Sequence, residues 1–320
     1  MFTEFSNDRV SSIMDYKYKF GSSQNIVKQI ALVASLAIAS TIGFSNFALA
    51  KDPFRNENAR DIGKYTEEAF KTIFLEGNYK TVSVPLSKAE VEEPNEPLAH
   101  AMLASLAYTE KDWESIKKYA DKTLESARLL SETDPLRGNL YLAVGHFLDG
   151  AYIYEKEGAI DAIEKLQLVF KFLDRAEASD PNDPELNLIK GYIDLFLAVN
   201  LPFSKPEQAI ARFEGYAAPN YLVERGLAVA YRDLNKYQEA LEYADKAIET
   251  APENPEHYYL KGQILRQIGK KENNIQVLKV AVENFELALA KSAQLPNFVL
   301  ETLEKENRLT KEKIAEIESR

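Results

Sequence analysis

The sequence contains no cysteine and only three histidines among 320 residues. The missing thiols exclude disulfides, thiolate metal sites, cysteine nucleophiles and a lipid-modified N-terminal cysteine. His100, His146 and His257 lie too far apart to form a local metal motif. The thirteen glycines form neither GxGxxG nor GxxxxGK[ST], and HExxH and GxSxG do not occur. These absences favour a non-catalytic protein with no metal and no cofactor.

Positively charged residues are fewer than negatively charged ones. The chain has 39 Lys and Arg against 50 Asp and Glu, a formal charge of −11. Such an acidic surface repels a phosphate backbone, so general nucleic-acid binding is not expected. Hydrophobic residues at 45% and charged residues at 28% are ordinary globular values, which favour a packed protein over a disordered one.

The N-terminal fifty residues read as a targeting segment. Residues 30–42 carry no charge, three lysines precede them, and Ala48-Leu49-Ala50 fits a signal-peptidase site at Ala48 and Ala50. A start at Met14 instead of Met1 gives a leader of more usual length. The alternative is an uncleaved membrane anchor formed by residues 30–50. Either way we expect export, to a periplasm or a thylakoid lumen, because an exported protein without cysteine suits a bacterial or plastid setting.

A 34-residue repeat dominates the rest of the chain. Its clearest copy is residues 221–254, in which small and large residues alternate at helical spacing and a proline ends the pattern. The signature positions there are Ala228, Tyr231, Ala240, Ala247 and Pro252, followed in phase by Gly262 and Gly269 and matched earlier by Ala104, Gly145 and Gly191. Small residues let two antiparallel helices approach closely, while the large ones fill the remaining gaps.

The spacing predicts an all-α fold of six antiparallel helix pairs. The expected units are residues 63–96, 97–137, 138–183, 184–220, 221–254 and 255–296. Residues 51–62 form a linker or the start of the first helix. The last segment, 297–320, is rich in Glu and Lys and is expected to be a capping helix whose outer face stays in water. Two departures stand out, Pro85 within the second helix of the first unit and an elongated second helix through Ala293 in the sixth.

This pattern resembles the tetratricopeptide repeat, most specifically in residues 221–270. The resemblance implies an α-solenoid whose first helices line a concave groove that binds a protein or peptide. Carried over by phase, the expected groove residues are Tyr108, Leu142, His146, Asp149, Leu188, Tyr192, Leu195, Arg225, Val229, Arg232, Tyr259, Gln263 and Arg266. The middle of this groove is apolar and its C-terminal third is cationic, which suits a peptide carrying a carboxylate.

Ordinary core packing is the competing interpretation of several of these residues. Leu188, Tyr192 and Leu195 lie at i, i+4 and i+7, the spacing of any buried helix face. Residues in the irregular 138–220 region also leave room for another hypothesis, a pocket for a small molecule or glycan. A hidden enzyme is a third reading and would depend on His146, Asp149 and Asp194.

The leading hypothesis is an exported scaffold or assembly factor that binds a protein, for example a membrane-complex subunit. The run from Pro184 to Tyr192 and the connection from Asn200 to Ser204 are similar to those of exported cyanobacterial tetratricopeptide proteins. That narrower resemblance implies association with membranes through the N-terminal segment and work on photosynthetic complexes.

Overall fold

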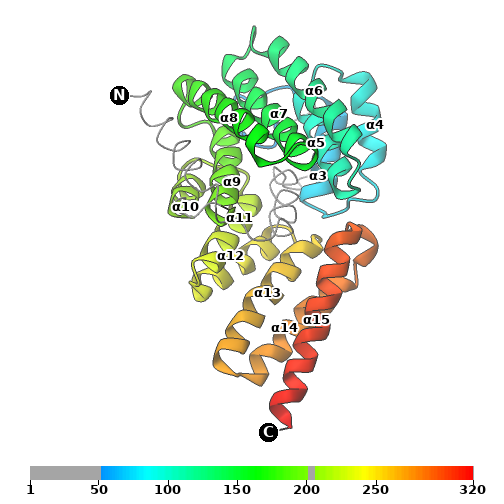
Figure 1. Cartoon of the computed structure of the whole chain (residues 1–320). Coiled ribbons are helices and arrows are strands. Elements are labelled where there is room, and N and C mark those ends of the chain that lie inside the picture. Colours follow the sequence, from blue (N-terminus) through cyan, green and yellow to red (C-terminus); the bar gives the residue numbers. More distant parts are fainter. Residues whose placement is uncertain (1–51, 201–205, 320) are drawn as a thin grey trace.

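The computed structural model describes residues 52–200 and 206–319, and within these ranges the chain is helical with no β-strand. The predicted leader, with Ala48, Ala50 and the alternative start at Met14, lies outside the described residues. The helices are α3 (Lys64–Phe74), α4 (Ser83–Glu92), α5 (Pro97–Thr109), α6 (Trp113–Leu130), α7 (Pro135–Lys156), α8 (Ala159–Ser179), α9 (Pro184–Asn200), α10 (Pro206–Gly215), α11 (Asn220–Asp233), α12 (Tyr237–Thr250), α13 (Pro255–Glu272), α14 (Ile275–Leu289) and α15 (Asn297–Glu318). Neighbouring helices pack in six successive pairs, and α15 caps the last pair (Figure 1). The all-α solenoid that the sequence predicted is therefore confirmed.

Four of the first helices begin in the same way, with a polar capping residue followed by proline. The capping side chains accept backbone N–H groups of the first turn, and proline supplies a helical φ where no N–H is needed. The pairs are Glu96-Pro97, Asp134-Pro135, Asp183-Pro184 and Asn254-Pro255. Pro135 thus opens α7, three residues before the predicted unit boundary at residue 138.

Small residues lie where the helices of a pair approach closely, as expected. A Cβ added to Gly262 would stand 2.5 Å from the ring of Phe285, and one added to Gly145 would stand 2.7 Å from Leu124. Gly269 faces Leu278 in the same manner. This glycine does not end α13, because the helix runs on to Glu272 and the left-handed residue beyond it is Asn273, with φ 49°.

The pairs differ in length. Pro85 lies in the first turn of α4, a helix of only 10 residues, whereas α7 and α8 have 22 and 21 residues and form the longest pair. The prediction of an elongated second helix through Ala293 was wrong. The helix α14 ends at Leu289, and a separate 3-10 turn over Ser292–Gln294 leads into α15.

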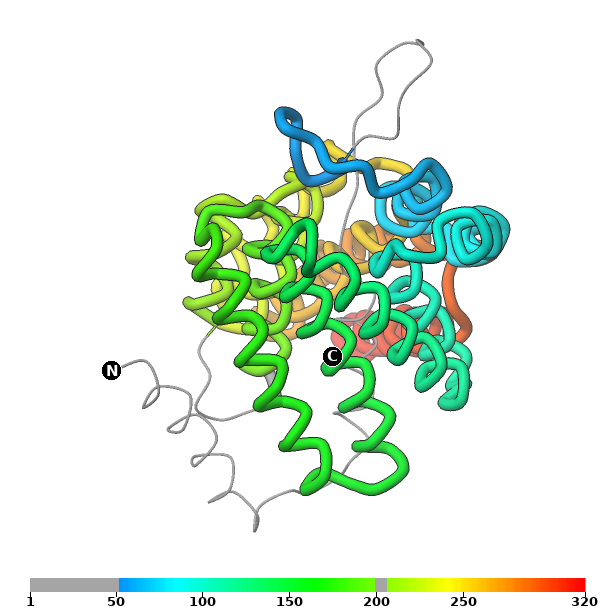
Figure 2. Tube along the Cα trace, turned by 90° about the horizontal axis from the view of Figure 1, so that it is seen from above, coloured from blue at the N-terminus to red at the C-terminus, as the bar shows by residue number. Residues whose placement is uncertain are grey.

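The array closes on itself rather than staying open. The Asn254 side chain, before α13, donates to the carbonyl of Phe74 at the end of α3 (2.9 Å). Tyr79 donates its backbone N–H to the carbonyl of Gln294 (2.9 Å) and its hydroxyl to Glu256 (3.2 Å). The first pair therefore lies beside the start of α13, and Figure 2 shows the N-terminal part of the described chain next to the segment around residue 250.

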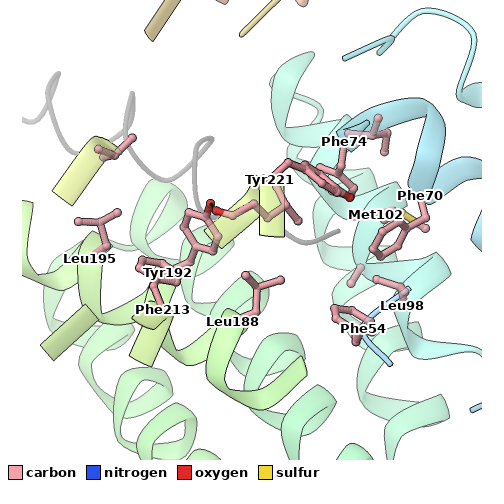
Figure 3. Close-up of a cluster of buried hydrophobic side chains, with 14 of the residues drawn as sticks. Phe54, Phe70, Phe74, Leu98, Met102, Leu188, Tyr192, Leu195, Phe213 and Tyr221 are labelled. Atoms are coloured by element: carbon pink, nitrogen blue, oxygen red, sulfur yellow. Dashed lines mark hydrogen bonds between the residues drawn. The ribbon is translucent and has the colours of Figure 1, made fainter. Parts of the chain in front are cut away.

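One apolar core runs through this closed arrangement. It joins Phe70, Phe74 and Met102 from the first two pairs to Leu188, Tyr192 and Tyr221 from the fourth and fifth (Figure 3). The edge-to-face contacts of Phe70 with Phe54 and Phe74, with centroids 5.6 and 5.5 Å apart, are typical of packed aromatic side chains. Much of the predicted concave surface is therefore interior.

Candidate partner-binding surface

Four of the predicted groove residues come together near the C-terminal end of the array. Arg232 of α11 donates to the side-chain oxygen of Gln263 on α13 (3.0 Å). The Gln263 amide in turn donates to Glu306 of α15 (3.0 Å), and the Arg266 guanidinium lies 4.0 Å from the same carboxylate. Tyr259 packs beside them. We call Arg232, Tyr259, Gln263, Arg266 and Glu306 the C-terminal cluster.

Glu306 is the member of this cluster that the sequence reasoning missed. The sequence predicted that the outer face of α15 stays in water but did not place Glu306 on the inner face. The helix buries Leu303, Asn307, Thr310 and Ile314, a stripe that also turns Glu306 toward α13. That i, i+4, i+7, i+11 spacing was the available signal.

The cluster is close to electrically neutral because carboxylates already accompany its arginines. Arg232 pairs with Asp233 at 2.8 Å, and Arg266 faces Glu306. Burial, together with the charge of Glu306, raises the pKa of Tyr259 well above its ordinary value. The surface thus offers hydrogen-bond donors and an aromatic ring, and an acidic peptide would compete with Asp233 for Arg232 and with Glu306 for Arg266.

Seven other predicted groove residues lie in the interior, namely Tyr108, Leu142, Leu188, Tyr192, Leu195, Arg225 and Val229. Tyr108 is buried and packs edge-on against Trp113, with ring centroids 5.6 Å apart. Tyr192 is 1% exposed and donates its hydroxyl to the carbonyl of Leu222 (2.5 Å). Arg225 is buried in an ion pair with Glu256 (2.8 Å). For these residues the core-packing interpretation describes the structure, because the closed array leaves them no free surface.

His146 and Asp149 lie in a seam between second helices instead of facing a groove. The His146 ring stacks on Phe172 of α8 at 5.4 Å. The buried Asp149 carboxylate lies between Lys117 of α6 (3.5 Å) and Lys165 of α8 (2.7 Å). The pKa of His146 is lowered mainly by burial and, to a smaller extent, by the positive charge of Lys165. The two side chains therefore sit between α6 and α8.

Asp194, the third residue on which the enzyme hypothesis depends, is also in an ion pair. Asp194 accepts from the Arg212 guanidinium at 2.8 Å. Among the described residues no group of three or more His, Asp or Glu side chains is placed to hold a metal ion. The structure thus does not bring His146, Asp149 and Asp194 into one unpaired set of titratable groups.

Successive first helices are linked by buried arginine–carboxylate pairs, which the sequence reasoning did not foresee. Arg137 of α7 makes two bonds to Glu96 at the start of α5 (2.9 and 2.7 Å), and its Nε atom donates to both carboxylate oxygens of Glu185 of α9 (3.4 and 3.2 Å). Arg225 of α11 repeats the arrangement with Glu256 of α13. In sequence, Glu185 and Glu256 each follow the proline that opens a first helix. This Pro-Glu pair could have indicated a carboxylate at the start of these helices.

The fold and these contacts define an all-α helical-repeat protein. Residues 225–288 match the family model described as Tetratricopeptide repeat. This segment covers most of α11 and all of α12 and α13, and it ends one residue before the end of α14. No curated protein and no solved structure matches the chain at a significant level. The chain is therefore similar to the tetratricopeptide repeat over its fifth and sixth helix pairs.

Proposed function

We propose that this protein is a non-catalytic scaffold that binds a protein or peptide partner. The observation that carries the proposal is the stack of six helix pairs, whose fifth and sixth pairs match the tetratricopeptide repeat. Repeats of this kind generally serve protein–protein interaction. A stack of helix pairs offers an extended, rigid surface for such contacts and needs no reactive group.

The C-terminal cluster is the part of the proposed surface best suited to a partner. Arg232, Tyr259 and Arg266 are all partly exposed, in contrast to the buried Tyr108, Tyr192 and Arg225. Arginine and tyrosine are the residue types that contribute most to binding at protein interfaces. A peptide backbone or a polar side chain would accept hydrogen bonds from the two guanidinium groups.

Capture of the partner tests this proposal. The tagged full chain and its Arg232→Ala and Arg266→Ala variants would be used as baits in gently solubilised extracts of the source organism. Arg308→Ala is the matched control, since Arg308 is exposed on α15 and, within the described ranges, its ion pair is with Glu312 of its own helix. We expect the two cluster variants to lose a partner that the wild type and the control retain. Equal recovery by all four baits would place the interaction on another surface.

A setting at a membrane is the narrower form of the proposal. Support comes from the apolar, charge-free residues 30–42 and the Ala48 and Ala50 pattern. Among the described residues no helix is long and apolar enough to cross a membrane. We propose that the protein is exported and that its N-terminal segment acts as a signal peptide or as a membrane anchor. The proposed partner is a subunit of a membrane complex, and more specifically of a photosynthetic complex. Co-fractionation with membranes, and release by mild salt or alkali, distinguishes peripheral attachment from an anchor.

The second candidate function is binding of a small molecule or glycan in the 138–220 region. It is supported by the His146 seam, where the buried Nδ1 atom has no hydrogen-bond partner beside the face of Phe172. A thermal-shift screen of metabolites, run on the wild type and on His146→Ala, tests it. A flat response across a broad panel would remove this candidate.

A further inference from the structure

The segment before the first helix is neither a linker nor part of α3. Residues 52–62, which we call the N-terminal strap, are non-helical and fold around Asp52. The Asp52 carboxylate accepts the backbone N–H groups of Phe54 (2.9 Å) and Arg60 (3.2 Å). Phe54 and Ile62 are buried in the core. The strap is thus a small folded loop held by its own polar bonds and two apolar anchors.

The strap lies on an acidic recess that the helix array builds without it. Asp134 and Asp183 each use one carboxylate oxygen to cap a helix, accepting from the N–H groups of Arg137 and Leu186. Their second oxygens point toward the strap, next to the Glu185 carboxylate at the start of α9. Because the caps fix these carboxylates, the recess is organised before any cation arrives.

Two arginines of the strap fill this recess. The Arg60 guanidinium contacts Asp134 (2.7 Å), Asp183 (3.2 Å) and Glu185 (3.1 Å). Arg55 pairs with Asp183 as well. A planar guanidinium with five donors matches several carboxylates at once, which an ammonium group does not. The recess is therefore shaped for arginine.

The array itself leaves the recess short of positive charge. Asp183 is fully buried with the strap in place, and the cations that pair with its Oδ2 atom among the described residues are Arg55 and Arg60 of the strap. The cation that the array contributes nearby is Arg137, which is already engaged by Glu96 and Glu185. When the strap leaves, water replaces its guanidinium groups at three clustered carboxylates, and the mutual repulsion of these carboxylates favours return of an arginine side chain.

We propose that this recess is a binding site for an arginine-bearing peptide segment and that the strap is its exchangeable intramolecular occupant. The fitting ligand carries two arginines five residues apart, with an aromatic residue directly before the first, as in Phe54, Arg55 and Arg60. Exchange requires release of the polar contacts of these two arginines and of the apolar anchors Phe54 and Ile62, while the strap backbone bonds to Asp52 of the strap itself. This site, at the starts of α7 and α9, shares no residue with the C-terminal cluster and does not depend on it.

A labelled synthetic peptide of residues 51–62 tests the proposal on the full chain. Binding is compared between the wild type and the Arg55→Gln/Arg60→Gln variant, in which the competing strap is weakened. We expect the variant to bind the peptide at least about tenfold more tightly. A peptide with both arginines replaced by glutamine should bind neither protein. Absence of binding to a folded variant, or equal binding of the two peptides, would overturn the proposal.

Hydrogen exchange of the wild type keeps the test decisive if the variant fails to fold. The amides of Phe54 and Arg60, which are bonded to Asp52, should exchange at least about tenfold faster than core amides of α7, because the strap leaves while the array stays folded. Equal protection would mean that the strap separates only on global unfolding, which contradicts exchange. Neither result bears on the scaffold function, which the capture experiment tests separately.

Discussion

At the scale of single residues, His257 shows how strongly the interior constrains a titratable group. It lies in the first turn of α13 with 0% exposure. Burial, with a contribution from the charge of Arg225, lowers the pKa of His257 to about 3. The folded protein therefore keeps this imidazole neutral, whereas the unfolded chain protonates it near the ordinary value of about 6.5.

This difference predicts an acid-sensitive fold. Because the unfolded state binds the proton first, the free energy of unfolding should fall as pH drops from about 6.5 toward 3, by up to about 1.4 kcal/mol per pH unit from this group. His257→Leu should flatten that dependence and leave the curve above pH 7 parallel to the wild type. Urea unfolding at a series of pH values measures it. An unchanged slope in the variant would show that His257 is not the group responsible.

Gly262 tests the close approach of α13 and α14. A Cβ at this position would lie 2.5 Å from the Phe285 ring, so Gly262→Ala must shift a fully buried side chain. We expect a loss of about 1–3 kcal/mol in the free energy of unfolding. Gly215→Ala is the matched control, because nothing lies within 4 Å of a Cβ there. A similar loss in both variants would argue against the packing explanation.

At the scale of helices, local sequence was enough to predict most of the architecture. The 34-residue spacing of Ala228 and Gly262 located the fifth and sixth pairs. Helix starts were harder to predict, because Pro135 opens α7 although the predicted second unit extended to residue 137. Proline is compatible both with the end of a repeat unit and with the first turn of a helix. The bond from the Arg137 backbone N–H to the Asp134 side chain identifies the start of α7.

The candidate site was predictable only in part, for a reason of sequence distance. Arg232, Tyr259 and Arg266 meet as expected because they lie on successive first helices of the best-matching repeats. Glu306, 40 residues beyond Arg266, enters the cluster through the packing of α15. The burial of Tyr192 and Arg225 follows from closure of the array, which rests on contacts between residues about 180 positions apart. No local pattern encodes such a contact.

The buried ion pairs between first helices give a prediction at this scale. Arg137→Ala removes the cation that faces Glu96 and Glu185, two buried carboxylates on neighbouring helices. We expect a loss of about 3–5 kcal/mol, since Glu96 remains buried without a cation while Glu185 keeps its contact with Arg60. Arg308→Ala, which breaks an exposed pair with Glu312, should cost less than about 1 kcal/mol. Chemical denaturation compares the two, and equal losses would contradict the structural role of Arg137.

For the whole molecule, closure of the array decides which surfaces are free. The Asn254 side chain has two tasks, capping α13 through the N–H of Glu256 and donating to the carbonyl of Phe74. The Asn274 side chain, by contrast, caps α14 by accepting the N–H groups of Gln276 and Val277 and makes no comparable contact with another helix pair among the described residues. The two asparagines are thus a matched pair that separates closure from capping.

Asn254→Ala should therefore cost more than Asn274→Ala. Loss of a cap costs about 1 kcal/mol, and the orphaned Phe74 carbonyl adds about 1–3 kcal/mol in the first case alone. Hydrogen exchange should also show faster exchange in α3 for Asn254→Ala only. If both variants lose the same free energy and α3 stays equally protected, the bond between the first pair and α13 does not hold the array closed.

The central claim, that this protein is a scaffold with its partner surface on the C-terminal first helices, is tested most directly by site-specific crosslinking. A photo-crosslinking residue is placed at Gln267, exposed on α13 one turn beyond Gln263, and in parallel at Val280, exposed on α14. Both full-length proteins are irradiated in the source organism. The account predicts a single protein adduct from position 267 and none from position 280. An adduct from position 280 alone, or from neither position, would contradict it.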